Sequence, residues 1–497
     1  MQDKRPPTGS AALLGAFRHM LAQPDLIGRL QSGLIGNDAV VDGPFGEKLL
    51  VYADYVASGR ALLQIETFVL QHVLPYYANS HTEASYCGGR MTQMRREARG
   101  IIGECCGATD EHAVIFAGSG ATAGINRLVT LLGVHQAVAA GERVHVIIGP
   151  YEHHSNILPW RESGARMTEI AESPDGGPDL DALDAALHDA APNDLVICAF
   201  SAASNVTGIV TDVAAVTRRV KAAGARMVWD YAGAGPYLPI AMSPAGAAEI
   251  DAIVVSPHKF IGGPGASGIL IVRRDAVVVK KPSWPGGGTV RFVSPSSHDY
   301  SDSLEAREEA GTPNVIGDIR AALAFMVKAA IGDDVMRQRN TELTRRAIAA
   351  WQDQPCIELL GPLDVPRLPI FSFRVRDGKE GFLHQQLVTR LLSDRFGIQA
   401  RGGCACAGPY VHRLLSIDEV ESEKLRQDIL AGREIEKPGF IRLNFSVLLP
   451  DEKVEFILQS VLELARSAPQ YVSMYACDTR RAIFSPKEDV PLVSLAS

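Results

Sequence analysis

Between residues 114 and 272, short runs of β-branched and other apolar residues alternate with segments of helical periodicity. Strands that are separated by crossover helices form mostly parallel sheets, so this pattern predicts an α/β fold. In open sheets of this kind, ligands bind beyond the carboxyl ends of the strands, and the residues that follow each strand are the first candidates for function. The predicted strands are 113–117, 143–148, 195–200, 226–229, 252–255 and 268–272.

The length of 497 residues allows one large α/β unit with smaller additions. Residues 1–45 are rich in helix formers and are predicted to form an N-terminal helical extension. Residues 46–318 are predicted to form the large domain, with its first part packing on a smaller C-terminal domain, residues 319–497. In that last region a long helical stretch leads into a second α/β pattern at 368–375, 385–396 and 440–445.

Charge and cysteine usage exclude several classes of function. The chain has 49 Lys and Arg against 57 Asp and Glu, a net charge of −8, which gives no electrostatic basis for binding nucleic acid or an anionic membrane. No stretch approaches the roughly 20 apolar residues of a membrane span, and no secretion signal is predicted. The eight cysteines do not resemble a disulfide framework, so a reducing compartment, the cytoplasm, is predicted.

A lysine stands directly after the predicted strand 252–255, in Ser256-Pro257-His258-Lys259. A lysine at the end of a buried strand is partly desolvated, which favours its neutral amine and a Schiff base with a carbonyl cofactor. Taken alone, a surface lysine at a strand end explains the same residue. Lys259 is therefore a candidate for the Schiff-base lysine, and other residues of the chain must support this role.

Three other strand ends carry suitable polar groups. Asp230 follows strand 226–229, where a carboxylate could keep a pyridinium nitrogen protonated, although it could also be a helix cap. The Gly-rich turn 117–122 precedes a helix whose first amides and Thr122 could bind phosphate. His153 follows strand 143–148 and could stack on an aromatic cofactor. Metal ligation or a solvated loop would also explain His153, but no His or Cys cluster lies nearby, so no metal site is predicted.

Taken in order, these segments resemble the class V aminotransferase family of pyridoxal phosphate (PLP) enzymes of fold type I. The similarity spans about residues 51 to 465 and is nearest to the cysteine desulfurase and selenocysteine lyase branch. It implies an aspartate aminotransferase-like fold, with a large mostly parallel mixed sheet and a smaller α/β domain, a PLP cofactor, and a homodimer with shared active sites. The segments are Gly120-Ala121-Thr122, Glu152-His153-His154-Ser155-Asn156, Ser204-Asn205, Asp230, Ser256-x-His258-Lys259 and Glu309-Ala310-Gly311-Thr312-Pro313-Asn314.

The resemblance implies a role for each matching residue. Lys259 would bond to the cofactor aldehyde, Asp230 would pair with the pyridine nitrogen, and the catalytic His153 would stack on the ring. Asn205 would approach the cofactor's phenolic oxygen or the substrate carboxylate, and Arg442 would form a bidentate pair with that carboxylate. The phosphate would be held by Ala121, Thr122, Ser256, His258 and, from the neighbouring subunit, Thr312.

A cysteine loop carries the second resemblance. Residues 401–409 contain Arg-x-Gly-x-x-Cys-Ala-x-Pro, which is similar to the desulfurase loop that holds the catalytic cysteine, and Cys406 is the match. Cys404 lies two residues early. A thiolate is the nucleophile, so the loop must activate it, and Arg401 is one plausible cation. From the residues alone, a structural thiol or a C-x-C half-site for metal or redox chemistry stays open.

The implied reaction is release of sulfur from L-cysteine, or a related thiol or selenol amino acid, to give alanine through a Cys406 persulfide, with a possible sulfur-acceptor protein. Two departures leave alternatives open. Gly233 stands where desulfurases place a glutamine near the phenolic oxygen, so Tyr231 or a water would cover that oxygen. Cys404-Ala405 also replaces the histidine pair of many relatives. A class V aminotransferase, C–S lyase or epimerase acting on another amino acid, with the loop cysteines not catalytic, is the main alternative. The other alternative is a non-enzymatic sulfur-carrier or partner-binding protein.

Overall fold

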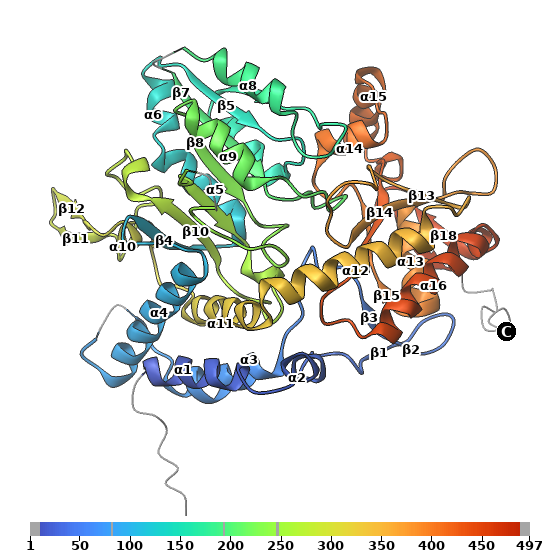
Figure 1. Ribbon diagram of the computed structural model, residues 1–497, viewed down its shortest axis with the longest axis horizontal. Coiled ribbons are helices and arrows are strands. Elements are labelled where there is room, and N and C mark those ends of the chain that lie inside the picture. The colour runs from blue at the N-terminus through green and yellow to red at the C-terminus, as the bar shows by residue number, and fades with distance from the viewer. Residues whose placement is uncertain (1–9, 81–82, 192–193, 245–247, 488–497) are drawn as a thin grey trace, which may run out of the picture.

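The computed structural model describes residues 10–80, 83–191, 194–244 and 248–487 (Figure 1). Residues 1–9 of the predicted N-terminal extension and residues 488–497 of the predicted C-terminal domain lie outside the described residues.

A seven-stranded mixed sheet forms the centre of the large α/β unit, in the order β4-β10-β9-β8-β7-β5-β6. Five neighbouring strands, β9, β8, β7, β5 and β6, are parallel to one another. Strand β10 runs antiparallel to both of its neighbours, β9 and β4. All six predicted strands are present. The edge strand β6 was not predicted because its sequence Arg-Met-Thr-Glu is polar and half-exposed. The strands are β4 (His112–Gly118), β5 (Val144–Ile148), β6 (Arg166–Glu169), β7 (Leu195–Ser201), β8 (Arg226–Asp230), β9 (Ala252–Val255) and β10 (Gly268–Arg273).

Helices cover both faces of this sheet and enclose two apolar cores. Successive strand residues point to opposite faces, so Ile115 and Phe116 of β4 lie in different cores. Side-chain oxygens of Asp179 and Asp212 accept amide hydrogens in the first turns of α8 and α9 and fix where these helices begin. One face is covered by α5 (Gly120–Leu131), α6 (Val134–Ala139) and α7 (Leu158–Glu162), and the other by α4 (Tyr86–Cys105), α8 (Leu180–His188), α9 (Val213–Ala222) and α11 (Val315–Ile331).

The described part of residues 1–45 contains two helices followed by a non-helical segment, and its role as an N-terminal extension stays a prediction. Leu13 and Phe17 of its first helix are buried in an apolar core that they share with α4 and α11. Figure 1 shows these blue helices lying along one end of the large unit. Its helices are α1 (Ser10–Leu21) and α2 (Leu26–Ser32), with α3 (Leu63–Phe68) packed beside them.

A four-stranded antiparallel sheet, in the order β13-β14-β17-β16, forms the centre of the C-terminal part. An earlier segment of the chain packs on this C-terminal part. There β3 (Val51–Tyr52) pairs in parallel with β15 (Ile398–Gln399), and Phe45 is buried in the apolar core of the C-terminal part. The predicted division at residue 318 falls within α11, which packs on α4 of the large unit, so this boundary stays a prediction. The elements are β13 (Ile357–Leu359), β14 (Ile370–Val375), β16 (Arg401–Gly403), β17 (Phe440–Asn444), α12 (Asp333–Trp351), α13 (Gln385–Phe396), α14 (Gly408–Leu414), α15 (Glu419–Leu430) and α16 (Asp451–Ser467).

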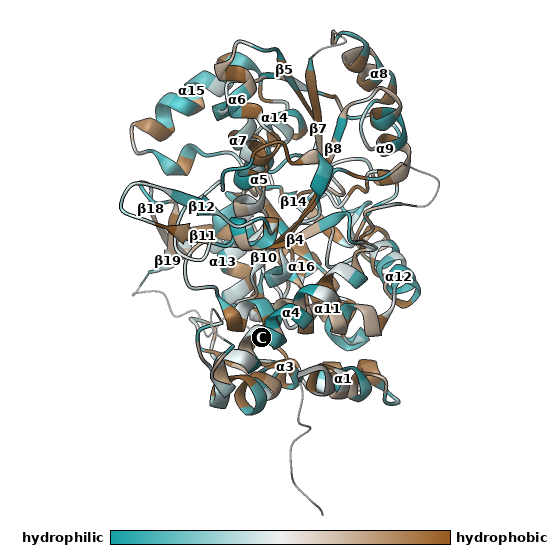
Figure 2. Cartoon of the chain, turned by 90° about the vertical axis from the view of Figure 1, so that its left-hand side faces the viewer, coloured by the Kyte–Doolittle hydropathy of each residue, from teal (hydrophilic) through white to brown (hydrophobic). Residues whose placement is uncertain are grey.

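The distribution of hydropathy follows this layering. Figure 2 colours strands β5 and β7 brown, whereas α12 shows both apolar and polar residues, as an outer helix with one buried face does. Within the described ranges we find no helix with both the length and the apolar character that crossing a membrane requires.

Candidate active site

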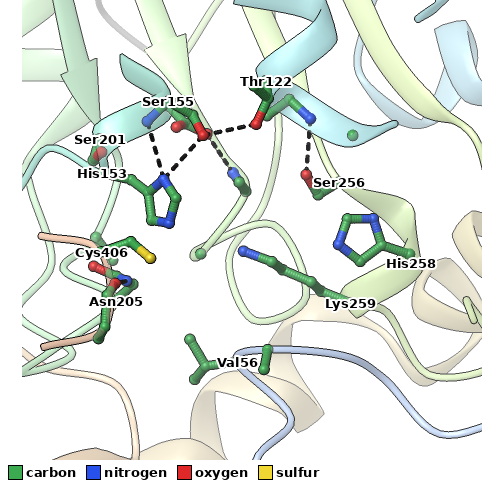
Figure 3. A pocket seen from close by; sticks show the side chains of 18 of the residues that line it. Val56, Thr122, His153, Ser155, Ser201, Asn205, Ser256, His258, Lys259 and Cys406 are labelled. Carbon is green, nitrogen blue, oxygen red and sulfur yellow. Dashed lines mark hydrogen bonds between the residues drawn. The ribbon is translucent and has the colours of Figure 1, made fainter. Parts of the chain in front are cut away.

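A cavity of about 240 Å³ lies at the carboxyl ends of the central strands, where the C-terminal part faces the sheet (Figure 3). Nearly all of the predicted site residues line it, although they are spread over more than three hundred positions of the chain. They are Ala121, Thr122, His153, Asn205, Asp230, Ser256, His258, Lys259, Cys406 and Arg442.

Lys259 ends a short 3₁₀ turn, Pro257–Lys259, directly after β9. Its amine points into the cavity, toward the side on which His153 and Cys406 lie (Figure 3). Burial, opposed by the Asp230 carboxylate and assisted by the Arg442 guanidinium, lowers the pKa of Lys259 from 10.5 to about 8. About a tenth of the amine is therefore neutral and nucleophilic at pH 7, and about half at pH 8.

Asp230 is the last residue of β8 and is buried. Its Oδ1 accepts a hydrogen bond from the Ala232 amide at 2.7 Å. Burial raises the pKa of Asp230, while that amide and the Lys259 ammonium lower it. A buried carboxylate of this kind is stabilised by a cationic partner, which a protonated pyridine nitrogen would supply.

The His153 ring is held from its Nδ1 side. Nδ1 accepts the Ser155 amide hydrogen at 3.1 Å and lies 3.0 Å from the Ser155 hydroxyl, which bonds the Thr122 hydroxyl at 2.7 Å (Figure 3). Burial and the nearby Lys259 lower the pKa of His153 to about 4. The ring is therefore neutral at neutral pH, which suits stacking on an aromatic cofactor better than an imidazolium would.

The start of α5 is the part of the cavity that fits a phosphate. The Ala121 amide donates to the Ser256 hydroxyl at 3.0 Å, and Thr122 and His258 line the same wall. Gly120 has φ +74°, and a Cβ there would lie only 3.0 Å from both Ser256 Oγ and His258 Cε1, so the close approach needs glycine. Hydroxyls and amides at the N-terminus of a 12-residue helix favour an anion.

Arg442 lies on β17 and is only 4% exposed. Its Nη1 donates to the Asn205 carbonyl at 3.0 Å and its Nη2 to Asp54 Oδ1 at 2.9 Å. Its Nε has no hydrogen-bond partner among the described residues, and neither has Asn205 Oδ1, although both atoms are buried. A buried donor left unpaired is costly, so the free Nε edge of Arg442 suits a ligand carboxylate.

Asp54 is a site residue that the sequence reasoning missed. It follows β3, it is buried, and its Oδ2 accepts a hydrogen bond from Arg401 Nε at 3.0 Å. The signal that could have found it is an acidic residue directly after the short apolar segment 51–53. Arg401, which was considered as a cation for Cys406, also lines the cavity and is paired with Asp54.

The two loop cysteines differ in position. Cys406 is exposed and lines the cavity, whereas Cys404 is half-buried and does not line it. Ala405 and Cys406 have φ of +51° and +56°, the left-handed region that residues with a Cβ rarely adopt. The chain therefore presents the Cys406 thiol through an unusual backbone turn.

Three other residues named in the sequence analysis differ in their position relative to the cavity. Thr312 is exposed and does not line the cavity, and its contribution from a neighbouring subunit stays a prediction. Gly233 lines the cavity, and a Cβ there would meet Asn205 Cβ at an ordinary 3.5 Å, so the position has room to begin a side chain. Tyr231 is buried and is not among the lining residues.

Within the described chain, no group of three or more His, Cys, Asp or Glu residues is placed to hold a metal ion.

Comparison with known proteins identifies the family of this chain. Residues 51–454 match the Aminotransferase class-V family. A cysteine desulfurase from Enterobacter sp. (strain 638) is 30% identical over 365 residues, which is 72% of this chain and 85% of that protein. A probable cysteine desulfurase from Pyrococcus abyssi is 26% identical over 438 residues, 87% of this chain and 98% of that protein. The chain belongs to the class V aminotransferase family.

Solved structures show the same fold. The apo structure of a cysteine desulfurase from Thermococcus onnurineus NA1 superposes with a TM-score of 0.68 at 24% identity, covering 84% of this chain and 95% of that one. A cysteine desulfurase from Escherichia coli gives a TM-score of 0.67 at 21% identity, covering 88% and 98%. The implied fold type I architecture is confirmed. Since the family depends on PLP, this protein is a PLP-dependent enzyme.

Proposed function

We propose that the enzyme releases sulfur from L-cysteine, or a related thiol or selenol amino acid, giving alanine, and that Cys406 receives the sulfur as a persulfide. The observation that carries this proposal is one cavity lined by a lysine of lowered pKa, an accessible thiol and a buried arginine with a free donor edge. The names of the relatives, cysteine desulfurases with up to 98% of their length covered, support it.

The donor set fits the cofactor. Lys259 would bond to the PLP aldehyde, Asp230 would pair with the ring nitrogen, and His153 would stack on the ring. Bound PLP supplies an electron sink for the pair left on the substrate Cα when its proton is removed. Asn205 would approach the cofactor's phenolic oxygen or the substrate carboxylate, and because these oxygens accept, the donor would be its Nδ2, which also bonds the Ala405 carbonyl. Ala121, Thr122, Ser256 and His258, with Thr312 of a second subunit in a homodimer, would hold the phosphate.

The remaining work falls to side chains of this chain. Arg442 would bind the substrate carboxylate through its Nε edge and hold Cα beside Lys259. The Lys259 amine, once free, would remove the Cα proton, which its lowered pKa favours. The Cys406 thiolate would attack the substrate sulfur: a sulfur–sulfur bond forms, the carbon–sulfur bond breaks, and its electron pair stays with the carbon skeleton that is protonated to alanine. A thiol, free or on an acceptor protein, would then take the sulfur.

Replacing Arg442 with lysine should raise KM for cysteine by about 10- to 100-fold, because a lysine keeps the charge but loses the bidentate pair. Steady-state kinetics with cysteine measure this change. The matched control is Arg413→Lys on α14, which makes the same exchange at an arginine that pairs with Glu169 outside the cavity and should leave KM unchanged. An unaltered KM in Arg442→Lys would mean that the substrate carboxylate binds elsewhere.

The rate at which cofactor-free enzyme captures PLP should depend on pH through the Lys259 amine. The lowered pKa, about 8, means that the reactive neutral form increases about tenfold from pH 7 to pH 9 and levels off above pH 8. Stopped-flow absorbance measures this rate. Dividing it by the rate for neutral Nα-acetyl-lysine at each pH corrects for the titration of the cofactor itself. A rate that still rises tenfold per unit between pH 8 and pH 9 would indicate an amine of ordinary pKa.

A substrate panel tests the proposed reaction itself. The purified holoenzyme is incubated with single amino acids while sulfide, alanine and the cofactor spectrum are recorded. Desulfuration requires equal amounts of alanine and sulfide from cysteine in the presence of a reducing thiol, without a keto-acid acceptor. Spectral changes with another amino acid and no sulfide from cysteine would instead favour a class V aminotransferase, C–S lyase or epimerase.

A further inference from the structure

The loop that carries Cys406 has a backbone conformation that needs external support. Ala405 and Cys406 both have positive φ, +51° and +56°, and neither is glycine. Left-handed backbone brings a Cβ too close to the next carbonyl oxygen, so two such residues in succession persist only where neighbouring groups hold them. The supporting contacts therefore indicate which residues determine where the Cys406 thiol lies.

Three hydrogen bonds from other segments reach this loop. The His154 amide donates to the Cys406 carbonyl at 2.8 Å, and the Gly408 amide donates to His154 Nε2 at 3.1 Å. The third runs from Asn205 Nδ2 to the Ala405 carbonyl at 2.9 Å. His154 thus holds the chain at Cys406 through its backbone and at Gly408, two residues later, through its ring.

The ring contact replaces a helix cap. Helix α14 begins at Gly408 and follows Ala407, whose methyl side chain cannot accept an amide hydrogen. His154 Nε2 instead accepts the hydrogen of the Gly408 amide, which is the first amide of α14. A Cβ on Gly408 would lie 3.1 Å from that nitrogen, so the two segments are in close contact. Burial, Lys437 and Arg161 lower the pKa of His154, which keeps the ring neutral and able to accept.

His154 also belongs to the same turn as the ring-stacking residue. It follows His153 at the start of the 3₁₀ turn His154–Asn156, but it does not itself line the cavity. We infer that His154 is a positioning residue that fixes the Cys406 loop relative to the cofactor site. This inference rests on the proposed function only in taking Cys406 as the reacting thiol; the loop contacts stand apart from the reaction.

The test compares His154→Leu, which fills a similar volume without an acceptor, with His154→Gln, whose side-chain oxygen can still accept from Gly408. In the holoenzyme, we expect His154→Leu to lower kcat for sulfide release by about 10- to 100-fold, with KM for cysteine changed less than about twofold. Exchange of the substrate Cα hydrogen in D₂O, which needs Lys259 but not Cys406, should stay within about twofold of wild type. His154→Gln should recover most of the lost kcat.

Two readouts are independent of turnover. Hydrogen exchange in the peptide spanning residues 404–412, and the rate of Cys406 alkylation by iodoacetamide, should both increase in His154→Leu and return toward wild type in His154→Gln. Unchanged hydrogen exchange and alkylation would overturn the inference, as would an equal loss of Cα exchange and sulfide release. If instead the loop readouts change while Cys406→Ala keeps full desulfuration, the positioning role stands and the proposed persulfide does not.

Discussion

Replacing Lys259 with alanine should remove both turnover and the absorbance of the covalently bound cofactor. Among the described residues that line the cavity, Lys259 carries the one primary amine that can form the bond to the PLP aldehyde and then take the Cα proton. Loss of a general base alone costs about 10²- to 10⁴-fold, and loss of the covalent anchor adds to it, so we expect activity to fall by about 10⁴-fold or more. The absorbance spectrum and sulfide release from cysteine measure the two effects.

A second buried lysine provides the matched control. Lys328 of α11 has a pKa that burial also lowers to about 8, and its ammonium donates to the Leu238 carbonyl outside the cavity. Lys328→Met should keep the cofactor absorbance and most of the activity. Retention of the absorbance in Lys259→Ala, or its loss only in Lys328→Met, would show that the cofactor lysine has been wrongly identified.

Replacing Cys406 with alanine should separate cofactor chemistry from sulfur transfer. The variant keeps Lys259, Asp230 and His153, so the bound-cofactor absorbance and Cα hydrogen exchange should be retained. Sulfide release from cysteine should fall by about a hundredfold or more, because the attacking thiolate is gone. Sulfide assay and persulfide-selective labelling of the Cys406 peptide measure the loss.

Cys404→Ala is the control for this experiment, because Cys404 lies in the same loop, half-buried and away from the cavity lining. It should retain sulfide release. Full activity in Cys406→Ala would exclude the persulfide role and favour the other class V reactions. Loss of activity in Cys404→Ala alone would transfer the role to that thiol.

Local sequence patterns predicted the sheet and much of the cavity. The central strands are short apolar runs buried on both faces, which sequence composition reports directly, and Asp230 and Lys259 lie where such strands end. The meeting of these residues in one cavity follows from parallel strands whose carboxyl ends lie on one edge of the sheet. The family resemblance supplied the placement of Arg442 and Cys406.

The remaining features depend on contacts between distant segments. Asp54 bonds Arg442 from 388 positions away and Arg401 from 347, and no local pattern marks such a pair. The left-handed backbone at Cys406 depends on His154, more than 250 residues earlier in the chain, rather than on glycine in the loop. The surroundings of Thr312 in a homodimer require a second chain, and the homodimer and the cytoplasmic location stay predictions.

Reductive trapping tests the central claim most directly. The holoenzyme is treated with borohydride, digested and analysed by mass spectrometry for lysines that carry the reduced pyridoxyl group. We predict a single modified peptide, with the group on Lys259, and none on the Lys328 peptide. A pyridoxyl group on another lysine, or on no lysine of a protein that retains the cofactor, would contradict the account.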